Sequence, residues 1–301
     1  MIHLLYMKPA SSKVLIILAF FAIYVIWGST YLLNKVAVTE LPAFFFATFR
    51  FTCAGILLFG IALASGKKLT ITKKQLLNSI FVAFLFMVSG NGLFVWALKY
   101  VDSGFAALLA STQPLFVLLM MRFIDNKKMK RKSIIGVVFG ILGMYLLVSQ
   151  KELITDENTL LGILLIFSCV IGWSYASVFV SKADLPKNHL ISSGYQMLIA
   201  SVFLSIVSLC LGETWNSPLE WSTGVQWSMF LLIIFGSVVA FTAFNYLLKV
   251  VSTEKVATSS YVNPVVALFL GWYVLGEQLT GQSIVAATIL LVGVYFITSK
   301  K

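Results

Sequence analysis

The sequence predicts an all-α integral membrane protein with ten transmembrane helices, arranged as two five-helix inverted repeats. Of its 301 residues, 59% are hydrophobic and only 11% are charged, whereas soluble domains have roughly 45–50% apolar and 25% charged residues. The apolar residues form long continuous runs with short polar connections between them. The two halves of the chain also resemble each other, which indicates an internal repeat.

Apolar runs of roughly 17–25 residues, the length that crosses a bilayer as a helix, define the expected spans. The first run follows Lys8 and Lys13, as in a signal peptide, but no small-residue cleavage site follows it, so it is interpreted as a retained span. The ten spans are expected near residues 14–34, 42–64, 77–99, 104–124, 133–149, 159–181, 190–211, 226–249, 254–275 and 280–298.

Positive charges are concentrated in alternate connections between the spans. Eighteen lysines and arginines fall on the side that holds both termini, and three, Lys35, Lys99 and Lys151, fall on the other side. Cytoplasmic loops carry such an excess, so the chain is expected in the plasma membrane with both termini in the cytoplasm. The basic run 127–132 is interpreted as part of this signal, with affinity for anionic membrane lipid and not for nucleic acid.

The repeat is visible as an alignment without gaps between residues 94–148 and residues 244–298, at an offset of 150. At an offset of 146 the earlier part of the chain follows. The equivalent pairs include Pro114 with Pro264, Trp27 with Trp173, and Arg50 with Gln196. Each half holds five spans, an odd number, so equivalent helices run in opposite directions and the repeat is inverted. The expected halves are residues 1–150 and 151–301, within one transmembrane unit.

These features together resemble the EamA-type members of the drug/metabolite transporter superfamily over nearly the whole chain. The residues that carry the resemblance are Trp27-Gly28-Ser29, Arg50-Phe51, the proline-centred fourth and ninth spans, Tyr195-Gln196 and Gly276-Glu277. One departure is Asn126-Lys127, where the family pattern has a small residue and a glutamate after the fourth span. The resemblance implies transport of amino acids, other metabolites or drugs, and it favours export.

Substrates of inverted-repeat carriers bind near the midplane, where the halves meet. Polar and aromatic residues near span centres are therefore the candidate substrate-binding residues: Trp27, Tyr31, Arg50, Asn91, Trp96, Gln113, Trp173, Ser177, Gln196, Asn245, Tyr261 and Asn263. Pro114 and Pro264 cannot donate to the carbonyls of Ala110 and Ser260, so we expect breaks in the fourth and ninth helices that serve in gating.

Several of these residues have two interpretations that the sequence leaves open. Arg50, the one full charge near the middle of a span, either binds an anionic group of the substrate or braces the helices around it. Trp27 is either a wall of the pocket or an anchor at the membrane interface, and Asn91, between two glycines, serves either the cavity or helix packing. For Gln113 and Asn263 the cavity is favoured over helix-to-helix hydrogen bonding, because polar groups facing lipid are costly.

Several classes of function find no support in the residues. No Asp or Glu lies inside an expected span, and His3 and His189 lie at span ends or beyond, which argues against a proton relay within the membrane. No metal, cofactor or catalytic pattern is present, so the chain is not expected to be an enzyme. Gly136 and Gly140 indicate tight helix packing rather than a dimer face, and a monomer or weak homodimer is expected. The expected function is a secondary exporter of amino acids or other small metabolites that works by alternating access; the alternatives are a drug efflux carrier and a non-transporting scaffold.

Overall fold

The computed structural model describes residues 12–124, 131–149, 157–257 and 259–298, and within them the chain is helical. The described residues do not include the pair Asn126-Lys127, most of the basic run 127–132 or the two ends of the chain. The first half contains α1 (Ser12–Phe21), η1 (Ala22–Ile26), α2 (Trp27–Val38), α3 (Ala43–Ala64), α4 (Lys73–Ala83), η2 (Phe84–Gly92), α5 (Leu93–Ala97), α6 (Ser103–Ala110), α7 (Gln113–Ile124) and α8 (Arg131–Val148). The second contains α9 (Glu157–Lys182), α10 (His189–Cys210), η3 (Pro218–Glu220), α11 (Thr223–Leu231), η4 (Leu232–Phe241), α12 (Thr242–Val250), α13 (Thr253–Val256), α14 (Ser259–Leu275) and α15 (Gly281–Thr298).

Seven helical runs within the described residues are long and apolar enough to cross a membrane. They are Lys13–Val38, Ala43–Ala64, Lys73–Ala97, Ser103–Ile124, Asn158–Lys182, His189–Cys210 and Thr223–Val250, and shorter apolar helices cover Val262–Leu275 and Gly281–Gly293. Each run coincides with a span expected from the sequence. The chain is therefore a multi-pass, all-helical membrane protein.

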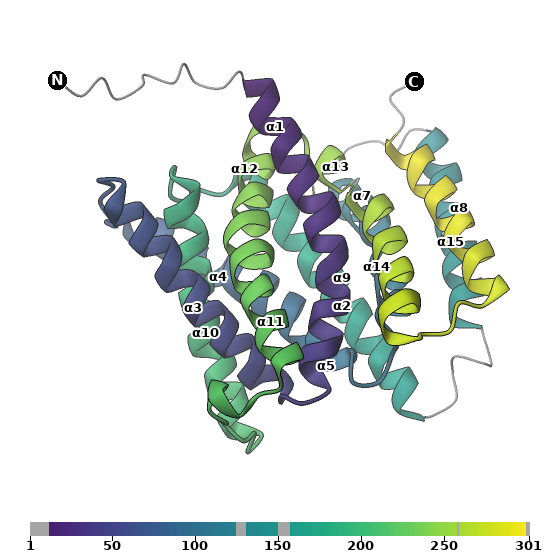
Figure 1. The fold of residues 1–301 in the computed structure, drawn as a ribbon. Coiled ribbons are helices and arrows are strands. Elements are labelled where there is room, and N and C mark those ends of the chain that lie inside the picture. Colours follow the sequence, from purple (N-terminus) through teal and green to yellow (C-terminus); the bar gives the residue numbers. More distant parts are fainter. Residues whose placement is uncertain (1–11, 125–130, 150–156, 258, 299–301) are drawn as a thin grey trace.

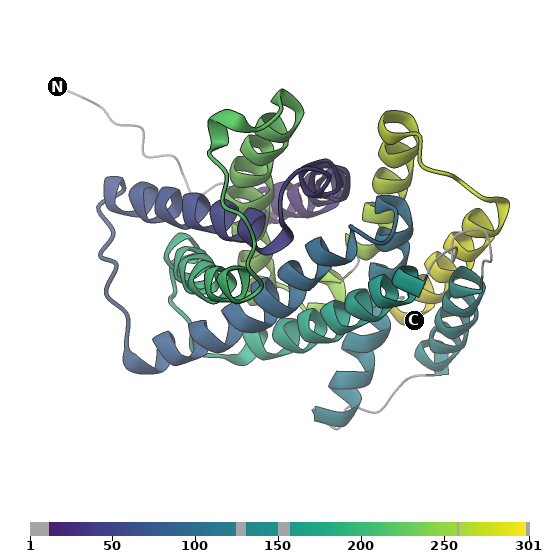
Figure 2. The same cartoon turned by 90° about the horizontal axis from the view of Figure 1, so that it is seen from below.

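The helices stand side by side and cross the molecule in one general direction (Figure 1). Viewed from below, α3 and α4 lie at one end of the molecule and the pair of α8 and α15 lies at the other (Figure 2). Between these ends, α3 packs along α10, α14 packs on α2 and α6, and α9 packs on η2 and α7. Elements from the two halves of the chain thus meet throughout the centre of the bundle.

Three long helices change to π-helical geometry at their centres, in η1, η2 and η4. Such segments widen the helix by one residue per turn and often occur at functional sites. In η2 the segment contains Gly90, where a Cβ atom would come within 2.7 Å of the Trp173 ring. A larger residue would therefore push α9 away from this helix, and the glycine allows the two backbones to approach closely.

Two helices 146 residues apart in the chain, α3 and α10, end in the same way. Gly66 and Gly212 follow them with φ of 70° and 66°, a left-handed conformation that glycine adopts without strain. In both, the next amide reaches back one turn, from Lys67 to the carbonyl of Ala62 and from Glu213 to that of Ser208. The two helix ends thus share their local geometry.

The two proline-containing helices differ from each other, which the sequence did not predict. In the expected fourth span, α6 ends at Ala110 and the chain turns at Ser111 and Thr112. The next helix, α7, begins at Gln113 beside Pro114. In the expected ninth span, α14 runs from Ser259 to Leu275 with Pro264 inside it. The expected break at Pro264 is therefore wrong, since the helix accommodates this proline within its second turn.

The pair of α8 and α15 confirms the interpretation of the Gly136 and Gly140 spacing as tight helix packing. A Cβ atom on Gly293 of α15 would lie 2.8 Å from the carbonyl oxygen of Gly136 and 2.9 Å from the amide nitrogen of Gly140. The two backbones therefore touch where three glycines coincide, which is how small residues stabilise helix pairs in membranes.

Two glutamates link helix ends across the halves on the predicted outer side. The carboxylate of Glu277, after α14, accepts from the amides of Ser103 (2.8 Å) and Gly104 (3.0 Å) at the start of α6. The carboxylate of Glu213, after α10, accepts from the amide of Phe45 (2.7 Å) at the start of α3. Carboxylates satisfy the unpaired amides of a helix N-terminus and favour its dipole, so both contacts fasten one half to the other.

Candidate functional site

A central pocket lies where the two halves meet, with about 900 Å³ of space that includes open solvent. Residues of ten elements line it: Trp27, Thr30, Tyr31, Asn34, Arg50, Phe51, Met87, Gly90, Asn91, Phe94, Ala107, Ala110, Ser111, Gln113, Cys169, Val170, Trp173, Met197, Gly236, Ser237, Phe241, Ser259, Ser260, Asn263 and Pro264. Many of the candidates named from the sequence are among them.

Arg50 enters this pocket from α3 and is held by two neutral side chains. Its Nε donates to Oγ of Ser237 on η4 at 2.8 Å, and its Nη1 donates to Oδ1 of Asn34 on α2 at 3.2 Å. The guanidinium carbon also lies 5.2 Å from the centre of the Phe51 ring. Arg50, Asn34 and Ser237 are all buried. The three helices that carry them are thus joined through one cation.

The charge of Arg50 has no carboxylate opposite it among the residues that the structure describes, and it is the one charged side chain in the described lining. A cation at the centre of a membrane helix costs about 2.5–3.5 kcal/mol. Hydrogen bonds to a charged group contribute about 1.5–3 kcal/mol each, so the two bonds are enough to keep Arg50 in place. They leave its positive charge uncompensated.

An aromatic wall formed by Trp27 and Trp173 closes one side of the pocket. The two rings meet edge to face, with centroids 5.7 Å apart and planes at 82°. Phe244 supports Trp27 from behind at 4.8 Å, and Nε1 of Trp27 donates to the carbonyl of Gly236 at 3.2 Å. Of the two interpretations of Trp27, the structure places this residue in the pocket wall. Edge-to-face pairs of this kind contribute about 0.5–1.5 kcal/mol beyond their burial.

The turn between α6 and α7 brings Gln113 to the pocket, where it contacts the other half of the chain. Its Oε1 accepts from Oγ of Ser260 on α14 at 3.2 Å. The break in the fourth helix and the first turn of α14 therefore meet directly. Because Pro114 has no amide hydrogen, it cannot donate to the carbonyl of Ala110, which also lines the pocket.

Asn91 and Asn263 line the same pocket with different surroundings. Asn91 lies in η2, and its buried Oδ1 has no hydrogen-bond partner among the described residues. Asn263 of α14, with its amide turned as the neighbouring carbonyls require, donates to the carbonyls of Tyr24 (2.8 Å) and Ile23 (3.0 Å) in η1. Asn263 thus braces the π-helical segment of the first long helix, whereas Asn91 offers an unused acceptor.

A second buried polar cluster holds two of the other candidates, away from the pocket. Nδ2 of Asn245 on α12 donates to Oε1 of Gln196 (3.3 Å) and Oγ of Ser193 (3.1 Å) on α10. Gln196 in turn donates to Oγ of Ser192 at 3.0 Å. Gln196 and Ser193 are completely inaccessible to solvent. This cluster joins α10 to α12 and does not line the pocket.

Tyr31 and Pro264 line the pocket, whereas Ser177, Trp96 and Pro114 lie outside the described lining. Ser177 is buried and donates to the carbonyl of Trp173 one turn earlier at 2.8 Å. Trp96 packs against Phe44 with ring centroids 5.6 Å apart. Pro114 is buried, and the side chain of Tyr261 lies outside the described part of the chain.

The structure adds pocket residues that the sequence did not predict, of which Ser237 is the most consequential because it holds Arg50. Its one signal in the sequence is the Gly236-Ser237 pair in the otherwise apolar stretch 229–241. Gly236 matters for the same contact, since a Cβ atom there would lie 3.2 Å from Nη2 of Arg50. Within the described residues, no group of three or more His, Cys, Asp or Glu side chains is placed to hold a metal ion.

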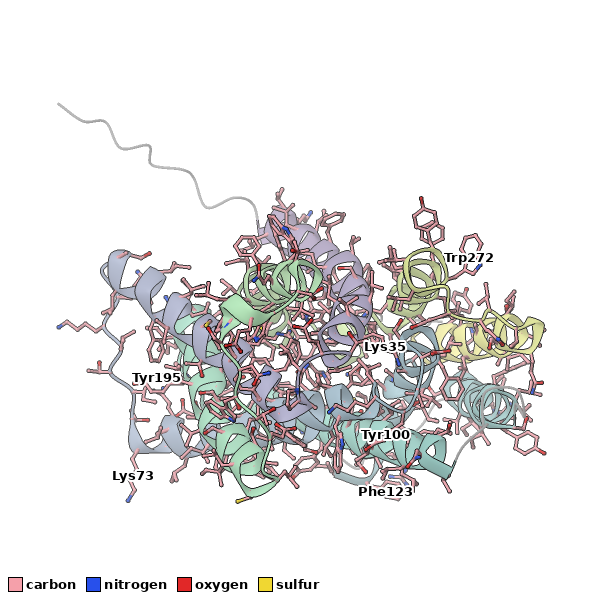
Figure 3. The ribbon with its side chains drawn as sticks, turned by 60° about the horizontal axis from the view of Figure 1, so that its bottom comes forward. Lys35, Lys73, Tyr100, Phe123, Tyr195 and Trp272 are labelled. Atoms are coloured by element: carbon pink, nitrogen blue, oxygen red, sulfur yellow. The ribbon has the colours of Figure 1, made fainter. Side chains whose placement is uncertain are left out.

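A separate group of charged side chains lies outside the pocket, near the start of α6. Lys35 lies between the helices, unlike Lys73, which projects from the edge of the molecule (Figure 3). Nζ of Lys35 donates to the carbonyls of Leu98 (2.7 Å) and Val101 (2.9 Å). Burial, together with the charge of Glu277, raises the pKa of the Asp102 carboxyl, and the charge of Lys35 opposes that rise.

Comparison with known proteins gives a consistent family and fold. Residues 14–149 and 160–299 match the EamA-like transporter family. The chain is 34% identical to the "Uncharacterized inner membrane transporter YedA" of Escherichia coli K12, over 94% of this chain and 90% of that protein. It is 27% identical to the "Uncharacterized transporter YoaV" of Bacillus subtilis, over 94% and 96% of the two chains.

A more distant relative carries a substrate in its name. The "S-adenosylmethionine/S-adenosylhomocysteine transporter" of Chlamydia muridarum is 24% identical, over 96% of this chain and 92% of that protein. A solved structure, described as "Crystal structure of protein", matches with a TM-score of 0.69 and 19% identity, over 93% of this chain and 94% of the other. At that identity the likeness concerns the fold alone.

Proposed function

The chain belongs to the EamA-like transporter family, and on that premise we propose that it is a secondary transporter that exports amino acids or other small metabolites by alternating access. The family and the transporter names of the relatives point to a transporter rather than an enzyme. In this proposal ten transmembrane helices form two inverted repeats, residues 1–150 and 151–301. The protein lies in the plasma membrane with both termini in the cytoplasm.

The central pocket is the observation that carries the proposal. Its lining combines residues from both proposed halves, such as Arg50 and Asn91 from the first and Trp173 and Ser237 from the second. A site at the interface of two inverted repeats is reached from either side of the membrane when one repeat rocks against the other. A scaffold protein has no need of a polar pocket inside the membrane, where unpaired polar groups are costly.

Gating is assigned to the helices that carry Pro114 and Pro264. The hydrogen bond between Gln113 and Ser260 joins these two helices at the pocket, so their separation or approach changes the access to the bound solute. The contacts of Glu277 and Glu213 join helix ends on the predicted outer side, and Asn78 donates to the carbonyl of Asp184 (2.8 Å) on the other side. In this view the halves open at the opposite side while these carboxylates stay bound, and the outer side opens when they release.

The residue types of the pocket lining favour transport without proton coupling. The described pocket lining has no Asp, Glu or His, so it has no carboxylate or imidazole to carry a proton with the solute. Movement is then driven by the gradient of the substrate itself, which suits release of an accumulated metabolite. The small-metabolite substrate of the Chlamydia muridarum relative agrees with this class.

A drug efflux carrier is the second candidate, favoured by the aromatic wall of Trp27 and Trp173. Purified protein reconstituted in liposomes, tested with labelled amino acids, other metabolites and drugs, separates the two. Uptake or release of metabolites supports the proposal, and movement of drugs alone supports the alternative. If no solute moves through folded, inserted protein, the transport function is wrong.

A matched pair of labelling variants shows whether solute passes through this pocket. In a background without the three cysteines, Ser260→Cys lies in the pocket lining, whereas Val265→Cys lies on the same helix with 55% of its side chain exposed. Reaction with a bulky maleimide is expected to abolish transport in the first variant and to leave it in the second. Equal transport in both labelled variants would contradict a route through the pocket.

A further inference from the structure

We infer that the substrate carries a carboxylate that binds Arg50 and, apart from it, a hydrogen-bond donor that binds Oδ1 of Asn91. The inference rests on the proposed function, because it names the chemical class that the transport pocket takes. It separates carboxylate-bearing metabolites from neutral and purely cationic solutes. Both anchoring groups belong to one pocket, Arg50 from α3 and Asn91 from η2.

The donor groups of Arg50 are only partly used by the protein. A guanidinium has five N–H groups in a fixed planar fork. Nε and Nη1 each donate one hydrogen bond, to Ser237 and Asn34. Nη2 donates none among the described residues, and the second hydrogen of Nη1 is also unused there. The two protein contacts thus fix the orientation of the fork and leave Nη2 and one hydrogen of Nη1 for a ligand.

A carboxylate matches these remaining donors in charge and in hydrogen-bonding capacity. Its two oxygens pair with two parallel N–H groups of a guanidinium, the strongest form of this contact. One carboxylate also neutralises the single charge in the described lining. A phosphate with two negative charges would keep one of them unpaired in a pocket with one cation, so the carboxylate is the better match.

The space around Nη2 is kept open by Gly236, which also fixes the pocket wall. A Cβ atom at Gly236 would lie 3.2 Å from Nη2, and the carbonyl of the same residue accepts the hydrogen bond of Trp27. One residue of η4 thus borders both the free side of the guanidinium and the aromatic wall. The body of a bound carboxylate would therefore lie beside Trp27 and Trp173.

Asn91 supplies the second contact because its acceptor is buried and unused. Oδ1 has no partner among the described residues, and a buried polar atom without a hydrogen bond is destabilising unless a ligand or water satisfies it. A hydroxyl or amide N–H on the substrate is the group that would do so. The pocket then selects molecules with a charged acceptor at one end and a donor elsewhere.

Matched pairs of acid and amide test the role of Arg50. Phenyllactate, mandelate and hydroxyisocaproate, each beside its primary amide, are offered to proteoliposomes together with the wider solute panel. Wild-type protein is expected to prefer the acids. Arg50→Gln is expected to lower kcat/KM for the acids on the order of 100-fold while it leaves the amides unchanged, and Arg50→Lys is expected to restore part of the loss.

Two further variants distinguish binding from bracing and test the second contact. The double variant Asn34→Ala with Ser237→Ala removes both acceptors of Arg50 but keeps its charge, so it is expected to retain the preference for acids with a raised KM. If Arg50 only braces the helices, this variant loses as much thermal stability as Arg50→Gln, and the acid preference does not change in either. Asn91→Leu is expected to weaken transport of phenyllactate about 5–10-fold and to leave phenylpropionate, which lacks the hydroxyl, unchanged.

The possible failures are distinguishable. Transport of amides or of other solutes without carboxylates, at rates equal to the acids, would overturn the inference and leave the proposed function standing. An unchanged acid preference in Arg50→Gln would also overturn it. Absence of any transport across the wider panel would instead remove the proposed function itself.

Discussion

Arg50 and Gln196 occupy equivalent places in the two aligned halves, yet their surroundings are opposite. Arg50 lies in the pocket lining, with a positive charge and unused donors. Gln196 is neutral, fully inaccessible, and engaged with Ser192 and Asn245 between α10 and α12. The difference shows that two positions matched by the sequence alignment can have different surroundings, one in a pocket and one between packed helices. The surroundings of each position depend on which neighbouring elements its helix packs against.

A charged residue at position 196, which is sealed from solvent and from the pocket, is the most severe test of the contrast between Arg50 and Gln196. Gln196→Arg would bury a cation among Ser192, Ser193 and Asn245, with no carboxylate or pocket among the described neighbours. We expect a loss of about 3–5 kcal/mol, enough to prevent accumulation of folded protein. The measurement is fluorescence-detected size-exclusion chromatography, with Gln196→Met as the control of similar size. A folded, active Gln196→Arg protein would show that the second cluster is open to ligand or water.

Removing the hydrogen bonds of Gln196 should lower stability and leave transport unaffected. Gln196→Leu leaves the Asn245 amide without one of its acceptors and Ser192 without a donor, at a cost of about 1–3 kcal/mol. Thermal unfolding in detergent measures the loss, and the transport rate per folded molecule is expected to equal that of wild type. A change in substrate preference would mean that this cluster also contacts the solute.

A methyl group added beside Arg50 tests the surroundings of this residue in the pocket with the smallest change in volume. Gly236→Ala brings a Cβ atom to about 3.2 Å from Nη2 of Arg50 and 3.1 Å from Cγ2 of Thr30, so the guanidinium has to shift. We expect KM for a transported acid to rise about 10-fold, with a stability change below about 1 kcal/mol. Gly60→Ala, which has open space around it, is the matched control and should leave both quantities unchanged.

The pH dependence of stability should come from groups outside the surroundings of Arg50 and Gln196, because neither contains a carboxylate among the described residues. Burial and the charge of Glu277 raise the pKa of Asp102 above its ordinary value of 3.8. The folded state therefore binds a proton more readily than the unfolded state, and this contribution to stability is lost as pH rises from 3.8 through the raised pKa. Asp102→Asn is expected to flatten the melting temperature over that window. An unchanged pH profile would assign the response to other groups.

The comparison also indicates how far sequence reasoning reached into the site. Trp27, Arg50, Asn91, Gln113 and Trp173 were predicted from their type and depth, and the structure brings them together around one pocket. Gln196 and Asn245 satisfied the same criteria but meet each other instead. Both groups avoid lipid for the same reason, the cost of an unpaired polar group, so hydropathy cannot distinguish them.

Residues that contact the site from apparently featureless stretches were missed for a related reason. Ser237 is one hydroxyl in an apolar run, and a single serine is common in membrane helices. Its role arises because η4 turns it toward Nε of Arg50, 187 positions away in the chain. Likewise, the two prolines were equivalent in the alignment, but α14 continues through Pro264 while α7 begins beside Pro114.

Membrane residence, helical structure and the positions of the spans follow from the amino-acid sequence, because hydrocarbon thickness and the need to pair every backbone group impose length and polarity along the chain. The prediction of a repeat uses the same linear information. The pocket follows only from the packed structure. Whether a polar side chain in a span meets a cavity, a neighbouring helix or a carbonyl is set by the rotation and contact of helices far apart in sequence. That is why Arg50 lines the pocket while Gln196, its counterpart in the alignment, is sealed between helices.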